Sequence, residues 1–279
     1  MLGHIVVFHL CCVLIAAMKC SSESPSLVPK YYLIEKCLRS KVGVVARAHY
    51  KSLTSCQRLG IEKKALAFNF SPPEAMNFTK GAMEYTCEVL KCAEAKGGLS
   101  LTDDTKFDYY SIYANPIPDI NSTCVPATGM FHLLEKRLNY TQAQVACRNL
   151  SGVLAEVISE QRTDTLAQFI AGAKLEAAYV GMRRYNTTKF VNTNGDSLEC
   201  STYRAWAPGH PRKQYKQYDC AVITRYRTWR SISCKAKYAA LCELIPAGPY
   251  KPGSIFSRKK MVGKALLQWF VELLWILPH

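Results

Sequence analysis

The sequence predicts an α+β fold for its C-terminal half, preceded by a smaller module that contains disulfides. Two observations support this prediction: two amphipathic helical segments precede several short strand-like segments, and cysteines stand at the ends of these elements. The size of the chain also fits this fold class, because 279 residues with 49% hydrophobic and 20% charged residues suffice for one to two domains with a buried core.

The first predicted helix covers NYTQAQVACRNL (139–150). Thr141 and Gln144 have the spacing of a capping box at its start. Its buried face follows the i, i+3, i+4, i+7 pattern of a helix, formed by Ala143, Ala146, Cys147 and Leu150. The second predicted helix covers 159–174 with Ser159 as its N-cap. Its buried stripe comprises Leu166, Phe169, Ile170 and Ala173.

Beyond Lys174 the helical pattern gives way to short apolar segments that are typical of strands. We expect strands at AYVGM (178–182), KFV (189–191), CAVIT (220–224) and YAALCEL (238–244).

The order of residues over 129–245 resembles the C-type lectin-like domain family. The matching pieces are Ala143-x-x-x-Cys147, GVLAEVISEQR (152–162), YVGM (179–182), WAPGHP (206–211), DC (219–220) and the Trp-x4-Cys-x3-Tyr-x3-Cys-Glu pattern from Trp229 to Glu243. The resemblance implies a C-type lectin-like fold with two helices, short antiparallel strands and a long loop region that carries the ligand site. It also implies two disulfides, Cys147–Cys242 and Cys220–Cys234.

In sugar-binding members of this family, carboxylates and amides in the loop region hold a calcium ion. The corresponding triplets here are His210-Pro211-Arg212 and Trp229-Arg230-Ser231. Calcium prefers six to eight oxygen ligands, whereas two of these positions now carry guanidinium groups. We therefore expect no metal at this site, no cofactor and calcium-independent binding.

The loop region is strongly basic, with nine Lys or Arg against two acidic residues between Glu199 and Lys237. The whole chain carries a net charge of +15. Arginine suits sulfate and carboxylate groups, and tyrosines offer faces for sugar rings. The candidate ligand-binding residues are Tyr203, Arg204, His210, Arg212, Lys213, Lys216, Tyr218, Arg227 and Arg230. Two interpretations remain open: a surface for an acidic glycan, or solvated loops whose charge only aids solubility.

The N-terminal end reads as a secretory signal peptide over 1–20, with a membrane anchor as the alternative. Removing it leaves ten cysteines, which suits a secreted, disulfide-bonded chain. Asn-x-Ser/Thr sequons also favour export. The candidate glycosylation sites are Asn77, Asn121, Asn139, Asn149 and Asn186, with Asn69 the weakest because Pro72 follows its sequon.

Residues 31–96 resemble a PAN or apple-type module, in which Cys56 and Cys87 match the family's pattern. An unrelated disulfide-containing extension remains the alternative. Cys56–Cys87 is the first pairing we expect, and Cys37, Cys92, Cys124 and Cys200 are left unassigned. Residues 97–128 read as a linker between the modules.

The C-terminal segment 246–279 reads as a linker and an apolar amphipathic helix. In 261–277, Lys264, Gln268 and Glu272 form one polar stripe, which suits contact with a membrane surface or with a partner. Packing on the chain's own domain is an equally good interpretation.

No catalytic set is recognisable, because the histidines lack metal-ligand spacing and neither a phosphate loop nor a Gly-x-Ser-x-Gly elbow occurs. We expect a non-enzymatic protein that binds an acidic glycan or a cell-surface or matrix glycoprotein, and no nucleic acid. Binding to a protein receptor without sugar recognition and a membrane-associated receptor are the alternatives. His210 could also strengthen binding in mild acid.

Overall fold

The computed structural model describes residues 28–76, 85–95, 100–113, 122–184, 189–214 and 217–248. The expected signal peptide (1–20) lies outside these ranges, and so does all but the start of the expected C-terminal segment (246–279). None of the helices within the described ranges is both long and apolar enough to cross a membrane.

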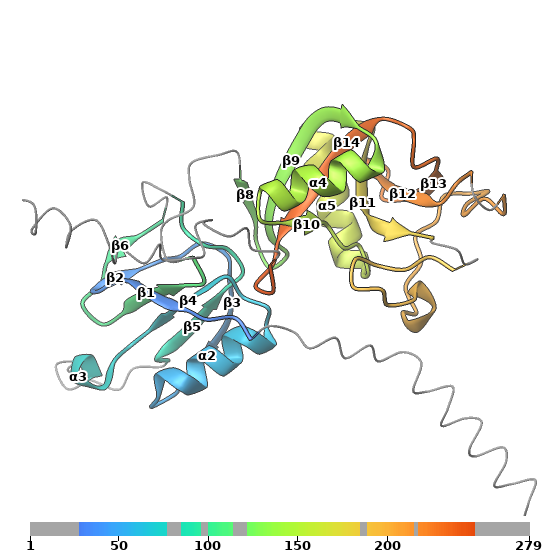
Figure 1. Cartoon of the computed structure of the whole chain (residues 1–279). Coiled ribbons are helices and arrows are strands. Elements are labelled where there is room, and N and C mark those ends of the chain that lie inside the picture. The colour runs from blue at the N-terminus through green and yellow to red at the C-terminus, as the bar shows by residue number, and fades with distance from the viewer. Residues whose placement is uncertain are drawn as a thin grey trace, which may run out of the picture.

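The N-terminal unit is an antiparallel five-stranded sheet in the order β1-β7-β4-β5-β3, with one helix on its face (Figure 1). Its elements are β1 (Tyr32–Glu35), β2 (Leu38–Arg39), β3 (Val44–Ala48), α2 (Leu53–Glu62), β4 (Ala67–Phe70), α3 (Pro73–Met76), β5 (Cys87–Leu90), β6 (Thr102–Asp103) and β7 (Asp108–Ser111). The Cys56–Cys87 disulfide joins α2 to β5, as the sequence predicts.

The segment 97–128 is not a linker. Its residues 108–111 form β7, which lies between β1 and β4 in the N-terminal sheet. Its residues 122–125 form β8, which pairs with β9 in the second sheet. The linker prediction was wrong because these strands are only four residues long and stand among turn residues, which dominate the local composition.

The second unit is built on the sheet order β13-β12-β11-β14-β9-β8, with β10 also paired to β14. Its elements are β8 (Ser122–Val125), β9 (Gly129–Leu138), α4 (Tyr140–Asn149), β10 (Val153–Leu154), α5 (Glu160–Gly172), β11 (Ala177–Arg183), the 3-10 turn η2 (Leu198–Cys200), β12 (Cys220–Thr224), β13 (Trp229–Ile232) and β14 (Tyr238–Leu244). Both predicted helices are present, and the segments 178–182, 220–224 and 238–244 lie in strands. The expected strand 189–191 forms only isolated bridges through Val191.

The helix α4 packs against β10, β14 and β9, burying Tyr140, Ala143 and Cys147 (Figure 1). Its capping box differs from the predicted one. The side chain of Asn139 accepts from the Gln142 amide, and the Gln142 side chain accepts from the Asn139 amide. The helix therefore begins earlier than the Thr141 pattern indicates.

The helix α5 has Ser159 as its N-cap, as predicted. Its buried face consists of Thr163, Leu166, Ala167 and Ile170, whereas Phe169 and Ala173 are half-buried at its margin.

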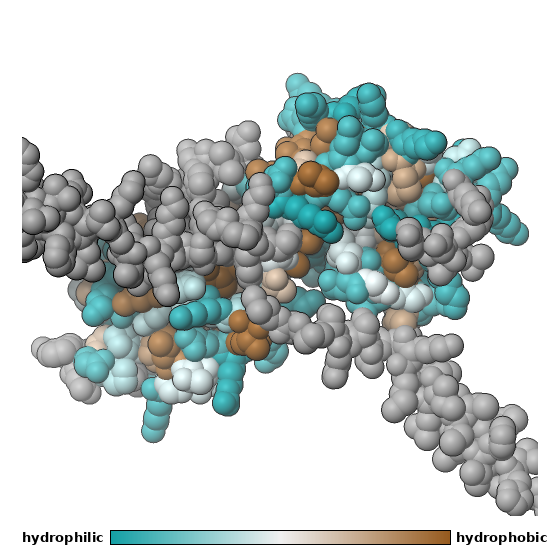
Figure 2. All heavy atoms as spheres, viewed as in Figure 1, coloured by the Kyte–Doolittle hydropathy of each residue, from teal (hydrophilic) through white to brown (hydrophobic). Residues whose placement is uncertain are grey.

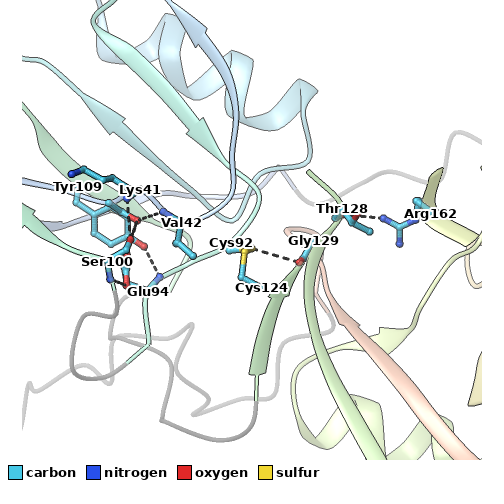
Figure 3. The surroundings of a disulfide bond; sticks show 11 residues. Lys41, Val42, Cys92, Glu94, Ser100, Tyr109, Cys124, Thr128, Gly129 and Arg162 are labelled. Carbon is cyan, nitrogen blue, oxygen red and sulfur yellow. Dashed lines mark hydrogen bonds between the residues drawn. A yellow bond between two sulfur atoms is a disulfide. The ribbon is translucent and has the colours of Figure 1, made fainter. Parts of the chain in front are cut away.

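The two units share a continuous apolar contact and a covalent bond. Met130 and Leu244 of the second unit belong to the hydrophobic core of the first. The Cys92–Cys124 disulfide joins the end of β5 to β8, beside the carbonyl of Gly129 (Figure 3). Gly43 has φ +66°, and a Cβ there would lie 3.0 Å from the sulfur of Cys92, so the junction requires glycine at this position.

Cys147–Cys242 and Cys220–Cys234, the pairs that the family resemblance implies, are both formed in the second unit. Cys200 is also disulfide-bonded. Cys37 is the free cysteine of the described residues and is exposed.

Candidate functional site

A cleft of about 580 Å³ opens in the second unit, and it brings together four of the nine predicted ligand-binding residues. We call it the cationic cleft. It is lined by Ala207, Pro208, His210, Arg212, Tyr218, Arg230, Ser231, Ile232, Ser233, Ala236 and Tyr238. The predicted residues among these are His210, Arg212, Tyr218 and Arg230.

The strand β13 places Arg230 on the cleft through its alternation of buried and exposed side chains. Trp229 is fully buried, and its indole nitrogen donates to the Thr163 hydroxyl of α5 at 3.3 Å. Ser231 is also buried, so Arg230 between them points outward.

Ser231 ties the loop 210–212 to this strand by two hydrogen bonds. Its amide donates to Nδ1 of His210 at 3.0 Å, and its hydroxyl accepts from the Arg212 amide at 2.8 Å. The His210–Pro211 peptide bond is cis. Because Nδ1 accepts a hydrogen bond from a backbone amide, the neutral ring carries its proton on Nε2.

Burial and the cations Arg212 and Arg230 lower the pKa of His210 below its ordinary value of 6.5. The ring is therefore neutral above pH 6.5, and the charge of the cleft comes from its two arginines.

Arg184 fixes the backbone of two residues that line the cleft, and sequence reasoning did not find it. It is buried, and its Nη2 donates to the backbone carbonyls of Arg212 at 3.1 Å and Tyr218 at 2.7 Å. Its Nε lies 3.3 Å from the Asp219 carboxylate. The guanidinium of Arg212 lies over the ring of Tyr218, 4.5 Å from its centroid. No sequence signal distinguishes Arg184 from an arginine at an exposed strand end.

Tyr179 contacts three residues of the cleft lining. The hydroxyl of Tyr179 donates to the Ala236 carbonyl at 2.7 Å and lies 3.3 Å from that of Ser233. The Tyr179 ring also contacts the ring of Tyr238 edge to face. Ser233, Ala236 and Tyr238 therefore form a fixed edge that sequence reasoning did not find.

The other predicted ligand-binding residues do not line the cleft. Tyr203 packs edge to face on Trp229 in the hydrophobic core, and exposed Arg204 donates to backbone carbonyls of its own loop. Arg227 lies in the turn at the other end of the β12–β13 hairpin, 3.8 Å from Asp164 of α5. Lys213 is exposed outside the cleft lining, and Lys216 lies outside the described residues.

Three of the candidate glycosylation residues, Asn77, Asn121 and Asn186, lie outside the described residues. Asn149 is exposed at the end of α4, and Asn139 is half-buried at its start. Asn69 is fully buried, and its Nδ2 donates to the Ser40 carbonyl at 2.7 Å and to Glu88 at 3.0 Å.

Within the part of the chain that the structure describes, no group of three or more His, Cys, Asp or Glu side chains could hold a metal ion. The surface seen in Figure 2 is largely hydrophilic, with hydrophobic residues in small separate groups.

Comparison with known proteins relates one part of the chain to a described type of domain. The model of the lectin C-type domain matches residues 136–244. Bovine Collectin-11 is 26% identical over 115 residues, which are 41% of this chain and 42% of the relative. Bovine Collectin-43 is 30% identical over 109 residues, 38% of this chain and 33% of the relative. The chain thus spans about two fifths or less of these relatives.

Among solved structures, human lithostathine superposes with a TM-score of 0.40 and 18% identity, over 46% of this chain and 98% of its own. None of these comparisons supports the PAN or apple resemblance of residues 31–96. Residues 136–244, with the fold and the two disulfides described above, form a C-type lectin-like domain.

Proposed function

We propose that this chain is a secreted, non-enzymatic recognition protein whose lectin-like domain binds acidic or sulfated glycans without calcium. The observation that carries the proposal is the convergence of Arg212 and Arg230 on one cleft. Their guanidinium groups donate planar pairs of N–H bonds, which match sulfate and carboxylate oxygens. His210 adds an Nε2–H donor to the same cleft when its ring is neutral.

The donor set of the cleft does not fit calcium. A calcium ion would need several carboxylate or carbonyl oxygens. The polar side chains of the lining are two cationic guanidiniums, an imidazole and the hydroxyls of two serines and two tyrosines, with no carboxylate among them. The Ser231 hydroxyl already accepts from the Arg212 amide. Repulsion between a dication and Arg212 and Arg230 adds to the loss of ligands.

The apolar part of the cleft lining supports a sugar rather than a bare anion as the ligand. Ile232, Ala236 and Tyr238 supply apolar and aromatic surface next to the two arginines. Ligand sites for organic molecules typically combine such a surface with a few fixed polar groups. A pyranose ring can lie on this apolar surface while its sulfate or carboxylate reaches the arginines.

The test is binding of the secreted, oxidised protein to an array of neutral and sulfated glycans, in calcium and in EDTA, at low and high salt. We expect EDTA-resistant binding to sulfated glycans that falls with salt, as multi-site phosphate binding does. Arg212→Ala and Arg230→Ala should each weaken it about tenfold or more, since hydrogen bonds to charged groups contribute about 1.5–3 kcal/mol.

Arg227→Ala is the matched control, because it removes the same charge outside the cleft. Equal losses in Arg227→Ala and Arg230→Ala would mean that only net charge matters. EDTA-sensitive binding to neutral sugars would overturn the proposal.

A further inference from the structure

Both chain neighbours of Asn139 pair with the segment 233–238 that lines one edge of the cationic cleft, and we call this position the rim. The residue before it, Leu138, pairs with the cleft residue Tyr238 across β9 and β14. The residue after it, Tyr140, donates its amide to the carbonyl of Cys234 at 3.0 Å, between the cleft residues Ser233 and Ala236. The start of α4 is thus fastened on both sides to the fixed edge of the cleft.

The local structure leaves the glycan-accepting atom of Asn139 unused by the helix. Asn139, Tyr140 and Thr141 form an Asn-x-Thr sequon, and Thr141 is exposed. The capping box uses the amide and the carbonyl oxygen Oδ1 of Asn139. A glycan is attached to Nδ2, so the helix cap and the modification are compatible.

The other sequon asparagines among the described residues lack this combination. Asn149 is exposed, but it lies ten residues away at the other end of α4, about 15 Å along the helix. At Asn69, Nδ2 is committed to two hydrogen bonds in the core, so the folded structure has no room for a glycan.

We propose that Asn139 carries an N-linked glycan that restricts access of long polyanionic chains to the cationic cleft. A bulky, hydrated glycan at the rim fills space beside the cleft that a long ligand would also need, whereas a short ligand can enter beside the glycan. The restriction of access rests on the proposed function, whereas the modification of Asn139 does not.

Intact-mass measurement of the full-length secreted protein, before and after peptide N-glycosidase treatment, tests the modification. Two variants remove the sequon and keep the helix cap: Thr141→Ala retains Asn139, and Asn139→Asp retains a capping carboxylate. Each should lose the mass of one glycan relative to the unmodified sequence. An unchanged mass in both variants would overturn the proposal.

Binding of long and short heparin fragments tests the position of the glycan. We expect Thr141→Ala to bind long fragments several-fold more tightly than the unmodified sequence, with little change for short ones. Asn149→Gln is the matched control and should leave both affinities unchanged.

Equal effects of Thr141→Ala and Asn149→Gln, or no effect of Thr141→Ala, would overturn the rim position. If the enzymatically deglycosylated protein also fails to bind heparin, the proposed function fails and the restriction of access with it. The mass measurement would still decide whether Asn139 is modified.

Discussion

At the residue scale, the surroundings of His210 decide how ligand binding in the cleft can depend on pH. Its Nδ1 accepts from the Ser231 amide, so protonation there would set two donors against each other. Burial, followed by the charges of Arg212 and Arg230, lowers the pKa of His210. Stronger binding in mild acid, which the sequence left open, requires the opposite shift.

We therefore predict that His210 titrates with a midpoint below 6.5 in the folded protein, measured by NMR of the imidazole. Because the unfolded chain takes up this proton first, the contribution of His210 to stability is full above pH 6.5 and declines as the pH falls below it. Ligand affinity should not rise between pH 7.5 and 6.5. A midpoint above 6.5, or a rise in affinity that His210→Ala abolishes, would contradict the prediction.

Arg162 joins three parts of the lectin-like domain through one side chain. It donates to the carbonyls of Glu156 at 2.9 Å and Thr128 at 3.0 Å, and its Nη2 lies 2.6 Å from the Glu243 carboxylate. The Glu243 side chain is only 11% exposed, so Arg162 replaces much of the solvent contact that this carboxylate has lost.

Arg162→Ala should lower the free energy of unfolding by about 3 kcal/mol, because it leaves a buried carboxylate without its partner. Urea denaturation measures the loss. Lys189→Ala is the control, since the exposed Lys189–Glu199 pair should contribute less than about 1 kcal/mol. Similar losses in the two variants would show that the buried network has no special role.

At the scale of elements, the β12–β13 hairpin explains why Arg227 lies apart from the cleft. The chain turns through Arg225, Tyr226 and Arg227, and Arg227 has φ +61°. A three-residue hairpin loop requires such a left-handed residue at its end, which is usually glycine. In the sequence this arginine reads as part of a continuous basic stretch, whereas in the structure it lies in the turn before β13, and the cleft is lined by residues further along that strand.

Arg227→Gly should raise the free energy of unfolding by about 1 kcal/mol, since a non-glycine residue in this conformation costs about 1–2 kcal/mol. The lost ion pair with Asp164 is exposed and offsets little of this gain. Thermal unfolding measures the shift, and Arg227→Ala should show no gain. Destabilisation by Arg227→Gly would mean that the Asp164 contact outweighs the backbone strain.

How far the sequence predicts each element depends on the length of its pattern. The helices α4 and α5 have ten or more residues, so their periodicity was sufficient to find them. The short strand β7 was missed because its pairing partners are distant in sequence. Distance along the chain also explains why Arg184 and Tyr238 were not among the candidate site residues, whereas His210 and Arg230 were. Arg184 and Tyr238 each lie more than 25 residues from Arg212, and only the fold brings them to the cleft.

At the scale of the whole molecule, the junction between the units is part of the N-terminal hydrophobic core. Met130 and Leu244 are buried among N-terminal residues, and Lys91 lies near Glu243 and Arg162. The amine of Lys91 also donates to the Lys63 carbonyl at the end of α2. The burial of Lys91 lowers its pKa, consistent with its place in this contact.

The Cys92–Cys124 disulfide should make the two units unfold as one. We predict a single calorimetric transition for the oxidised protein. The double substitution of Cys92→Ala and Cys124→Ala should lower the melting temperature of the N-terminal unit and separate the transitions. Closing a loop of this length, with a sequence separation of 32, contributes about 3–4 kcal/mol in the chain-entropy model.

Removing Cys56–Cys87 by the same double substitution is the matched control, because its sequence separation is 31 but it lies within the N-terminal unit. It should destabilise that unit by a similar amount without removing the covalent bond between the units.

The covalent bond and the shared core act together, so Met130→Ala should also separate the transitions. Two transitions in the unmodified protein, or one transition in the Cys92 and Cys124 variant, would show that the junction does not couple the units as proposed.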